Sequence, residues 1–190
     1  MEIHPVVDLA QWYQKELSEA FPPNERKPLA EIERLLAAGR YQVLGLYGDD
    51  GLLAYATLNT DPAYPDYLLL DYLGVTARLR SQGIGAQFLA LLGERFRGAC
   101  IIAESECPGP DCGEAENRLR TRRIGFYERC GLTAAYEMAT CGVRFRAMIL
   151  GEPGDLDALM TAHRAIYGPE RTDVRIPLPS GETPPPSHWA

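Results

Sequence analysis

Long apolar runs, a basic leader and an excess of positive charge are all missing from this sequence. No run approaches the ~18 apolar residues that a membrane-spanning helix needs. Residues 1–17 have neither the basic start nor the apolar centre of a secretory signal, so we expect a cytoplasmic protein. The net charge of −7 argues against nucleic-acid and membrane partners, and it slightly favours a neutral or cationic one.

Side chains that could bind a metal are few and dispersed. The three histidines, His4, His163 and His188, lie toward the two ends of the chain. The five cysteines are odd in number and scattered, so we expect free thiols rather than disulfides. Cys107 and Cys112 are close in sequence, but a zinc site would need two more ligands near them. The sequence therefore predicts no metal site.

Two common phosphate-binding motifs are incomplete. No Gly-Lys-Ser or Gly-Lys-Thr occurs, which excludes a Walker P-loop. The dinucleotide fingerprint fails at its third glycine, because Phe88 stands there, and seven residues separate Val75 from Gly83 where that fingerprint needs a tight turn. Glu104 does stand about where a ribose-binding acid is expected. A nucleotide-binding interaction protein therefore remains an alternative.

The chain does have a hydrophobic content of 46%, enough for a packed core in 190 residues. Its periodicity predicts helices over residues 8–20, 28–38, 84–96, 114–129 and 155–167. It predicts strands over residues 41–47, 52–58, 67–75, 100–104, 133–140 and 143–150, the first two joined as a hairpin. This order of elements predicts an α/β fold with a mixed sheet.

A glycine turn lies between the strand that ends at Val75 and the helix that begins at residue 84. The turn reads Arg80-Ser81-Gln82-Gly83-Ile84-Gly85. Glycine has no Cβ, so backbone amides there can approach a ligand closely. Amides at a helix start are unpaired donors at the positive end of the helix dipole. The turn therefore predicts a site for a phosphate or pyrophosphate.

This turn resembles the acetyl-CoA pyrophosphate loop of the GCN5-related N-acetyltransferase (GNAT) superfamily, which reads Arg/Gln-x-x-Gly-x-Gly/Ala after a strand. Arg80, Gly83 and Gly85 match that pattern in order. Residues 122–132, RRIGFYERCGL, look like the family's later helix, whose end reads Phe/Leu-Tyr, three residues, Gly-Phe. The resemblance covers about residues 25 to 150. It implies a GNAT-like mixed central β-sheet flanked by helices, with two parallel strands splayed to form the acyl-CoA cleft.

The resemblance also implies an activity and a domain plan. It implies an acetyl-CoA-dependent N-acetyltransferase that moves the acetyl group to an unidentified primary amine by direct attack in a ternary complex. The acceptor would be a small molecule or a peptide, and the protein a monomer or homodimer. Residues 1–150 would form the acetyltransferase domain, 151–176 an appendage packed on it, and 177–190 a disordered Pro-rich tail. A non-catalytic acyl-CoA-binding regulatory module is the alternative.

The implied contacts to the cofactor come mainly from the backbone. The pyrophosphate would lie on the amides of Arg80, Ser81, Gln82, Gly83, Ile84, Gly85 and Ala86. The pantetheine arm would run beside Leu73, Gly74 and Val75, and the Leu73 amide would donate to the thioester carbonyl. One position departs from the family. Many members carry an asparagine seven residues before the helix tyrosine, but this chain has Arg120 there and Asn117 three residues earlier.

The candidate catalytic side chains are one tyrosine and two carboxylates. Tyr127 matches the family tyrosine that lies near the sulfur, and it would be both a cofactor contact and the general acid for the departing thiolate. Glu104 or Asp71 would be the general base, unless a chain of waters takes that role. Asp71 precedes Leu73 by two residues, so regular strand alternation predicts that both side chains share a face.

Overall fold

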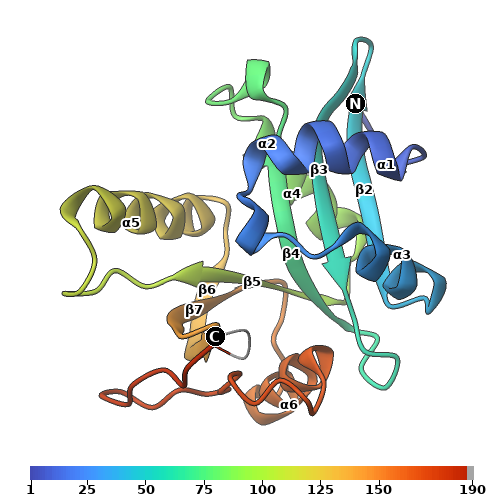
Figure 1. Cartoon of the computed structure of the whole chain (residues 1–190). Coiled ribbons are helices and arrows are strands. Elements are labelled where there is room, and N and C mark those ends of the chain that lie inside the picture. Colours follow the sequence, from blue (N-terminus) through green and yellow to red (C-terminus); the bar gives the residue numbers. More distant parts are fainter. Residues whose placement is uncertain (188–190) are drawn as a thin grey trace.

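The computed structural model describes residues 1–187, without the side chain of Asn24. Its centre is one mixed sheet in the order β1-β2-β3-β4-β5-β7-β6 (Figure 1). The strands are β1 (Glu2–Pro5), β2 (Tyr41–Gly48), β3 (Gly51–Asn59), β4 (Tyr67–Val75), β5 (Cys100–Glu106), β6 (Thr133–Thr140) and β7 (Val143–Leu150). The predicted α/β fold with a mixed sheet is therefore confirmed, as is the β2–β3 hairpin. Sequence analysis did not predict β1, a four-residue edge strand that pairs with β2.

The N-terminal helices cover one face of β2–β4. Residues 9–20 form α1 (Leu9–Trp12), a π-helical turn (Tyr13–Leu17) and α2 (Ser18–Ala20), and Asp8 caps them by accepting from the Gln11 amide at 2.8 Å. A short 3₁₀ turn (Pro23–Glu25) and α3 (Leu29–Ala37) follow. Figure 1 shows these helices in front of β2–β4. They bury an apolar cluster against the sheet: Trp12, Leu17, Ile32, Leu35, Tyr41, Val43, Tyr55 and Tyr72.

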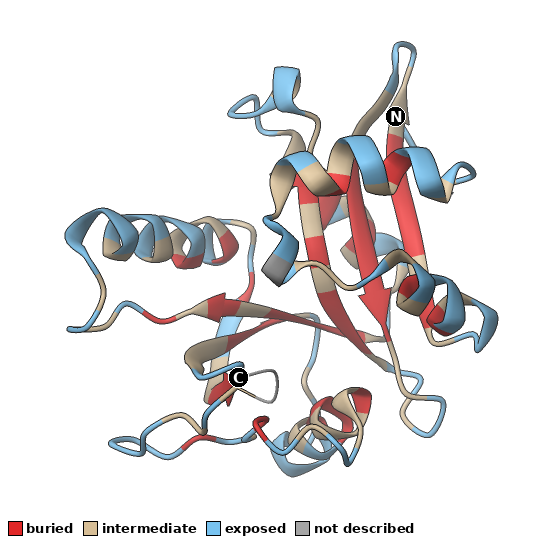
Figure 2. Cartoon of the chain, viewed as in Figure 1, coloured by how far each residue is buried: buried red, intermediate tan, exposed pale blue. Residues whose placement is uncertain are grey.

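The other helices cover both faces. On the opposite face, α4 (Ile84–Arg95) and α5 (Glu114–Arg129) pack on the largest cluster, which includes Leu68, Leu70, Phe88, Leu89, Leu92, Ile101, Ala103, Ile124 and Tyr127. On the first face, α6 (Leu156–Tyr167) packs on β4, β5 and β7 through Leu69, Ile102, Ile149, Leu159 and Ile166. Each fully buried large apolar side chain contributes ~1.5–3 kcal/mol. Figure 2 shows the resulting pattern, with buried strands and an exposed outer side of α5.

The parallel strands β4 and β5 separate partway along their length. They pair only from Tyr67–Leu70 to Cys100–Ala103, so Asp71–Val75 and Glu104–Glu106 have no common ladder. This is the splayed parallel pair that the resemblance implied. Among residues 1–187, no other strand pairs with the open edge of β4 beyond Leu70.

A β-bulge at Asp71 marks the point of separation. The β3–β4 register passes from Leu58–Leu70 directly to Thr57–Tyr72, which leaves Asp71 unpaired. A bulge inserts one residue and so changes which face the later side chains take. Leu73 therefore packs toward α4, whereas Asp71 bonds to Lys27 and Tyr41 on the face of α1–α3. The prediction that Asp71 and Leu73 share a face is wrong, because regular alternation stops at the bulge.

The segment after α6 returns along β6. Arg175 forms a bridge with Ala139, and the Leu178 amide donates to Glu137 O at 2.7 Å. The Leu178 side chain is buried, so the start of the segment predicted to be disordered is packed. Residues 188–190 of that segment lie outside the described residues. The domain boundaries at 150 and 176 stay a prediction.

Three compositional features can be followed in the described part of the chain. None of the helices within residues 1–187 is both long enough and apolar enough to cross a membrane. All five cysteines are free thiols. No group of three His, Cys, Asp or Glu side chains among the described residues could hold a metal ion.

Candidate active site

The glycine turn presents a row of unpaired backbone donors. Ser81 (φ 64°) and Gly83 (φ 80°) both have left-handed backbones, and such turns direct successive amides toward one side. The Arg80 amide donates to Ala77 O, and the Gln87 amide donates to Gly83 O. Between them, the six amides of residues 81–86 have no acceptor within residues 1–187. These donors form an anion-binding arrangement at the start of a twelve-residue helix.

The space above the turn is open. Residues 80–83 are exposed, and a Cβ placed on Gly83 would meet no atom within 4 Å. A Cβ on Gly85 would lie 3.4 Å from the Phe126 ring of α5 and 3.5 Å from Val75, so α5 and β4 border the turn. The Arg80 side chain donates to Val75 O at 3.2 Å and pairs with Glu19 at 3.4 Å, which keeps its guanidinium beside the turn.

The open edge of β4 directs further backbone groups toward the gap, by which we mean the space between Asp71–Val75 of β4 and Glu104–Glu106 of β5. In an antiparallel ladder, alternate residues bond to the partner strand and the others point away from it. The Thr76 amide donates to Leu53 O of β3, so the Gly74 amide points toward β3 as well. Leu73 and Val75 therefore direct their N–H and C=O groups to the other edge. The Arg80 bond to Val75 O, made from outside the sheet, agrees with this direction.

Packing holds this segment in place. Gly74 lies so close to Tyr55 that an added Cβ would be 2.2 Å from the ring carbon Cζ. The Tyr55 ring is itself buried, and its hydroxyl donates to Glu16 O at 3.1 Å. The glycine at position 74 is therefore required by the Tyr55 ring, and the backbone of residues 73–75 has little freedom to move.

Tyr127 lies on α5, on the same face of the sheet as the glycine turn. Its ring packs in the largest apolar cluster, with the Phe126 ring centroid 5.4 Å away. Its hydroxyl makes no hydrogen bond to any described residue. Burial raises the pKa of Tyr127 to about 12, so the phenol keeps its proton at neutral pH. The Tyr127 hydroxyl is therefore a proton donor without an acceptor among residues 1–187.

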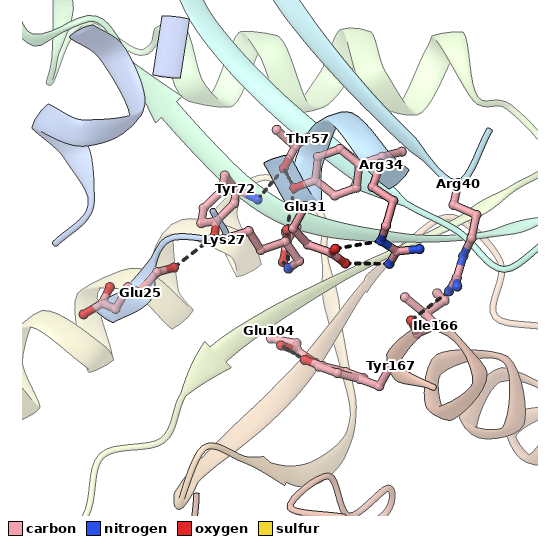
Figure 3. Close-up of polar contacts among 12 residues, drawn as sticks. Glu25, Lys27, Glu31, Arg34, Arg40, Thr57, Tyr72, Glu104, Ile166 and Tyr167 are labelled. Carbon is pink, nitrogen blue, oxygen red and sulfur yellow. Dashed lines mark hydrogen bonds and ion pairs between the residues drawn. The ribbon is translucent and has the colours of Figure 1, made fainter. Parts of the chain in front are cut away.

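Glu104 faces the opposite side of the sheet. Strand alternation places it with Ile102 toward α6, whereas Ile101 and Ala103 face α4 and α5. Its Oε1 lies 2.9 Å from His163 Nε2, and the Tyr167 hydroxyl lies 2.7 Å from both carboxylate oxygens. Figure 3 shows Glu104 and Tyr167 together, across from Lys27 and Tyr72. Burial, and then the charge of Glu104, raise the pKa of Tyr167 well above its ordinary value.

Asp71 lies on the same side as Glu104 but has a cation of its own. Lys27 Nζ donates to its two oxygens at 2.8 Å and 2.7 Å, and the Tyr41 hydroxyl donates to Oδ2. Burial, and then the Asp71 charge, raise the pKa of Tyr41 well above its ordinary value. The charge of Asp71 also contributes to the raised pKa of Tyr167, after burial and Glu104. The structure thus brings Asp71 and Glu104 to one side and Tyr127 to the other.

The family asparagine has no replacement in this chain. Arg120 donates to Cys107 O at 2.9 Å and forms ion pairs with Glu116 and Glu106. Asn117 bonds to the backbone of Gly109 in both directions and closes the loop before α5. Both side chains are therefore engaged within the protein, and the backbone edge of β4 is the remaining candidate to hold a pantetheine arm.

Sequence analysis missed several side chains of the site: Lys27, Tyr41, Tyr136, His163 and Tyr167. One of them carried a usable signal. His163 lies on the apolar stripe of the last helix with Leu159, Ala162 and Ile166, and all four are buried. A polar residue on such a stripe needs a partner, because an unpaired buried polar group is costly. The others are recognisable only once the chain is folded.

Comparison with curated proteins identifies a relative. The chain is 30% identical over 148 residues to "Putative acetyltransferase YjbC" of Bacillus subtilis (strain 168). The match covers 78% of this chain and 68% of that protein. No protein-family model matches the chain.

Solved structures share the fold at lower identity. A "Putative acetyltransferase from GNAT family" from Bacteroides thetaiotaomicron aligns with a TM-score of 0.69 and 21% identity, covering 88% of this chain and 99% of that one. A crystal structure of aminoglycoside 6'-N-acetyltransferase complexed with coenzyme A aligns with a TM-score of 0.59 and 16% identity, covering 78% and 96%. These likenesses confirm the fold that the two motifs implied.

Proposed function

Because this chain belongs to the GNAT family of acetyltransferases, we propose that it transfers the acetyl group of acetyl-CoA to a primary amine by direct attack within a ternary complex. The observation that carries the proposal is the row of six acceptorless amides at the start of α4, beside the open edge of β4. The structure of similar fold that contains coenzyme A supports the choice of acetyl donor.

The residues present fit coenzyme A in three respects. The amides of residues 81–86 offer donors to a diphosphate, and Arg78 and Arg80 add positive charge in an otherwise acidic chain. The N–H and C=O groups of Leu73 and the N–H of Val75 suit the peptide-like pantetheine arm, which would lie along β4 as an added strand does. Bound acetyl-CoA would supply an activated acetyl thioester.

Leu73 and Tyr127 would interact with the carbonyl oxygen and the sulfur of that thioester, respectively. The Leu73 amide would donate to the carbonyl oxygen as negative charge develops there, an interaction whose loss in other enzymes costs ~10²–10³ in rate. Tyr127 would give its proton to the departing sulfur, and its hydroxyl is available because no described residue accepts from it. Both groups belong to the side of the gap that carries the glycine turn.

We infer that Glu104 rather than Asp71 removes the proton from the amine. The carboxylate of Asp71 already holds the ammonium of Lys27 and the hydroxyl of Tyr41. Glu104 is as exposed as Asp71, at 15%, but it is bonded to His163 and to the Tyr167 hydroxyl instead of to a lysine. The amine would therefore enter from the α3 and α6 side, opposite the glycine turn, and the two substrates would meet in the gap between β4 and β5.

Cofactor binding and thiol release test the proposal in sequence. Acetyl-CoA at a hundredfold over its dissociation constant should add ~2.7 kcal/mol to the free energy of unfolding, and NAD should add nothing. An amine panel should then release free thiol, and Glu104→Gln should lower kcat by ~10²–10⁴ while acetyl-CoA affinity stays unchanged. Binding without thiol release would favour the regulatory module. Stabilisation by NAD alone would favour the nucleotide-binding alternative.

A further inference from the structure

We propose that His163 is a positioning residue that holds the carboxylate of Glu104 in a fixed orientation for proton removal, with Tyr136 in turn fixing the imidazole. The inference rests on the proposed function, because it requires Glu104 to act as the base. It extends that function to α6 and β6, two elements that neither sequence motif includes.

The helix that carries His163 is held by an N-terminal cap and by packing against the sheet. Asp155 caps α6 by accepting from the amides of Asp157 at 2.7 Å and Ala158 at 3.0 Å. Leu159 and Ile166, one turn on either side of the histidine, are buried against β5 and β7. The imidazole is 0% exposed, so bulk solvent does not reach it. Its position is therefore set by the sheet that also carries Glu104.

Both ring nitrogens of His163 are engaged. A carboxylate only accepts, so Nε2 must carry the hydrogen that Glu104 receives at 2.9 Å. In a neutral imidazole Nδ1 is then an acceptor, and the Tyr136 hydroxyl lies 2.8 Å from it. Burial raises the pKa of Tyr136 above its ordinary value, which keeps that hydroxyl protonated. The hydrogen bonds run from Tyr136 through His163 to Glu104.

Tyr167 completes the support from the same helix. Its hydroxyl lies 2.7 Å from both oxygens of Glu104. A glutamate side chain has several rotatable bonds, and two fixed donors remove most of that freedom before the amine arrives. The Glu104 side chain is 15% exposed, and Tyr136 and Tyr167 are also partly exposed. A carboxylate has about four lone-pair sites, so Glu104 can still accept from an incoming amine.

Several charged groups surround Glu104 and bear on its pH dependence. Asp71 of β4 lies on the same side of the sheet and is paired with Lys27. The Glu31–Arg34 pair of α3 lies across the gap (Figure 3). Arg171 stacks on the Tyr167 ring at 5.3 Å, while β7 presents Ala147 opposite Glu104. Loss of the His163 donor would leave a negative Glu104 less compensated near Asp71, so catalysis would require a higher pH.

Substitutions at position 163 separate positioning from packing. His163→Leu removes both nitrogens, and His163→Gln keeps one N–H that can reach Glu104. The leucine variant should lower kcat by ~10–100-fold and move the acid limb of the pH–rate profile to higher pH, with the KM for acetyl-CoA unchanged. The glutamine variant should recover most of both effects. Thr161→Ala is the matched control, because that exposed hydroxyl bonds only to Asp157 O of its own helix.

Each outcome decides between the alternatives. If kcat and the pH–rate profile are unchanged in His163→Leu, the positioning role is overturned. It is also overturned if His163→Leu and His163→Gln lose kcat equally and the pH–rate profile does not shift. If the leucine variant does not fold, Tyr136→Phe takes its place. This variant keeps the histidine. It should lower kcat and move the acid limb of the pH–rate profile to higher pH, both to a smaller extent than His163→Leu. A wild-type chain that releases no thiol with any amine would remove the proposed function and this inference together. If the wild type is active and His163→Leu has the same kcat and pH–rate profile, only the inference about His163 is removed.

Discussion

The hydroxyl of Tyr127 differs from those of the other buried tyrosines around the gap. Tyr41 and Tyr167 donate to carboxylates, and Tyr72 donates to Glu25 O. Tyr127 has an equally buried ring but no acceptor within the described residues. Since burial holds all of them protonated, the difference is the availability of the proton rather than its acidity. A donor left free in this way suits a group that arrives with a substrate.

Tyr127→Phe tests that role directly. Removal of the hydroxyl should lower kcat by ~10²-fold and leave acetyl-CoA affinity nearly intact, because the ring and its packing remain. The melting temperature should hardly change, since the lost hydroxyl has no partner among the described residues. Tyr47→Phe is the control, because its hydroxyl also makes no hydrogen bond within residues 1–187 and it lies on the β1 side of the sheet. Wild-type turnover in Tyr127→Phe would remove Tyr127 from the mechanism.

At the scale of elements, two local departures from regularity build the site. The left-handed residues Ser81 and Gly83 expose the first amides of α4, and the bulge at Asp71 divides β4 into a paired part and an open part. Sequence analysis predicted the first, because glycine spacing at a helix start is a local signal. The bulge at Asp71 was not predicted, because it depends on how the residues of β3 pair with those of β4 in the folded sheet.

Gly83→Ala should separate cofactor binding from stability. A Cβ at φ 80° costs ~1 kcal/mol in backbone strain, and it would also stand beside the amides that receive the diphosphate. We expect acetyl-CoA affinity to fall tenfold or more by calorimetry. Gly98→Ala is the matched control, since Gly98 has φ 95° and equally open space at the far end of α4. Equal acetyl-CoA affinity in Gly83→Ala and Gly98→Ala would contradict the placement of the diphosphate at the glycine turn.

At the scale of the whole molecule, the two faces of the sheet carry different chemistry where β4 and β5 separate. The face of α4 and α5 offers backbone donors and one free phenol, and the face of α3 and α6 offers carboxylates held by donors. A ternary complex needs this separation, because the acetyl donor and the amine must approach the same point from different directions. The fold supplies it by ending the β4–β5 ladder at Leu70 and Ala103.

The buried tyrosines also predict how the whole molecule responds to alkali. Burial raises the pKa of seven tyrosines above the unfolded value of ~10: Tyr41, Tyr47, Tyr55, Tyr72, Tyr127, Tyr136 and Tyr167. Above pH ~10 the folded chain therefore binds more protons than the unfolded chain, and the free energy of unfolding falls as pH rises. Their tyrosinate absorbance should appear together with loss of the circular-dichroism signal. Complete tyrosine ionisation in a chain that stays folded would contradict this.

The sequence alone determined the strands β2–β7, the principal helices and the glycine turn, because each depends on periodicity or on residues a few positions apart. It also singled out Tyr127, Glu104 and Asp71, but not how they are arranged. The tertiary structure decided that Asp71 faces Lys27 instead of sharing a side with Leu73, and that Glu104 meets a histidine 59 residues later in the chain. Contacts of that kind leave no local period, since they exist only when the packing of the sheet brings distant elements together.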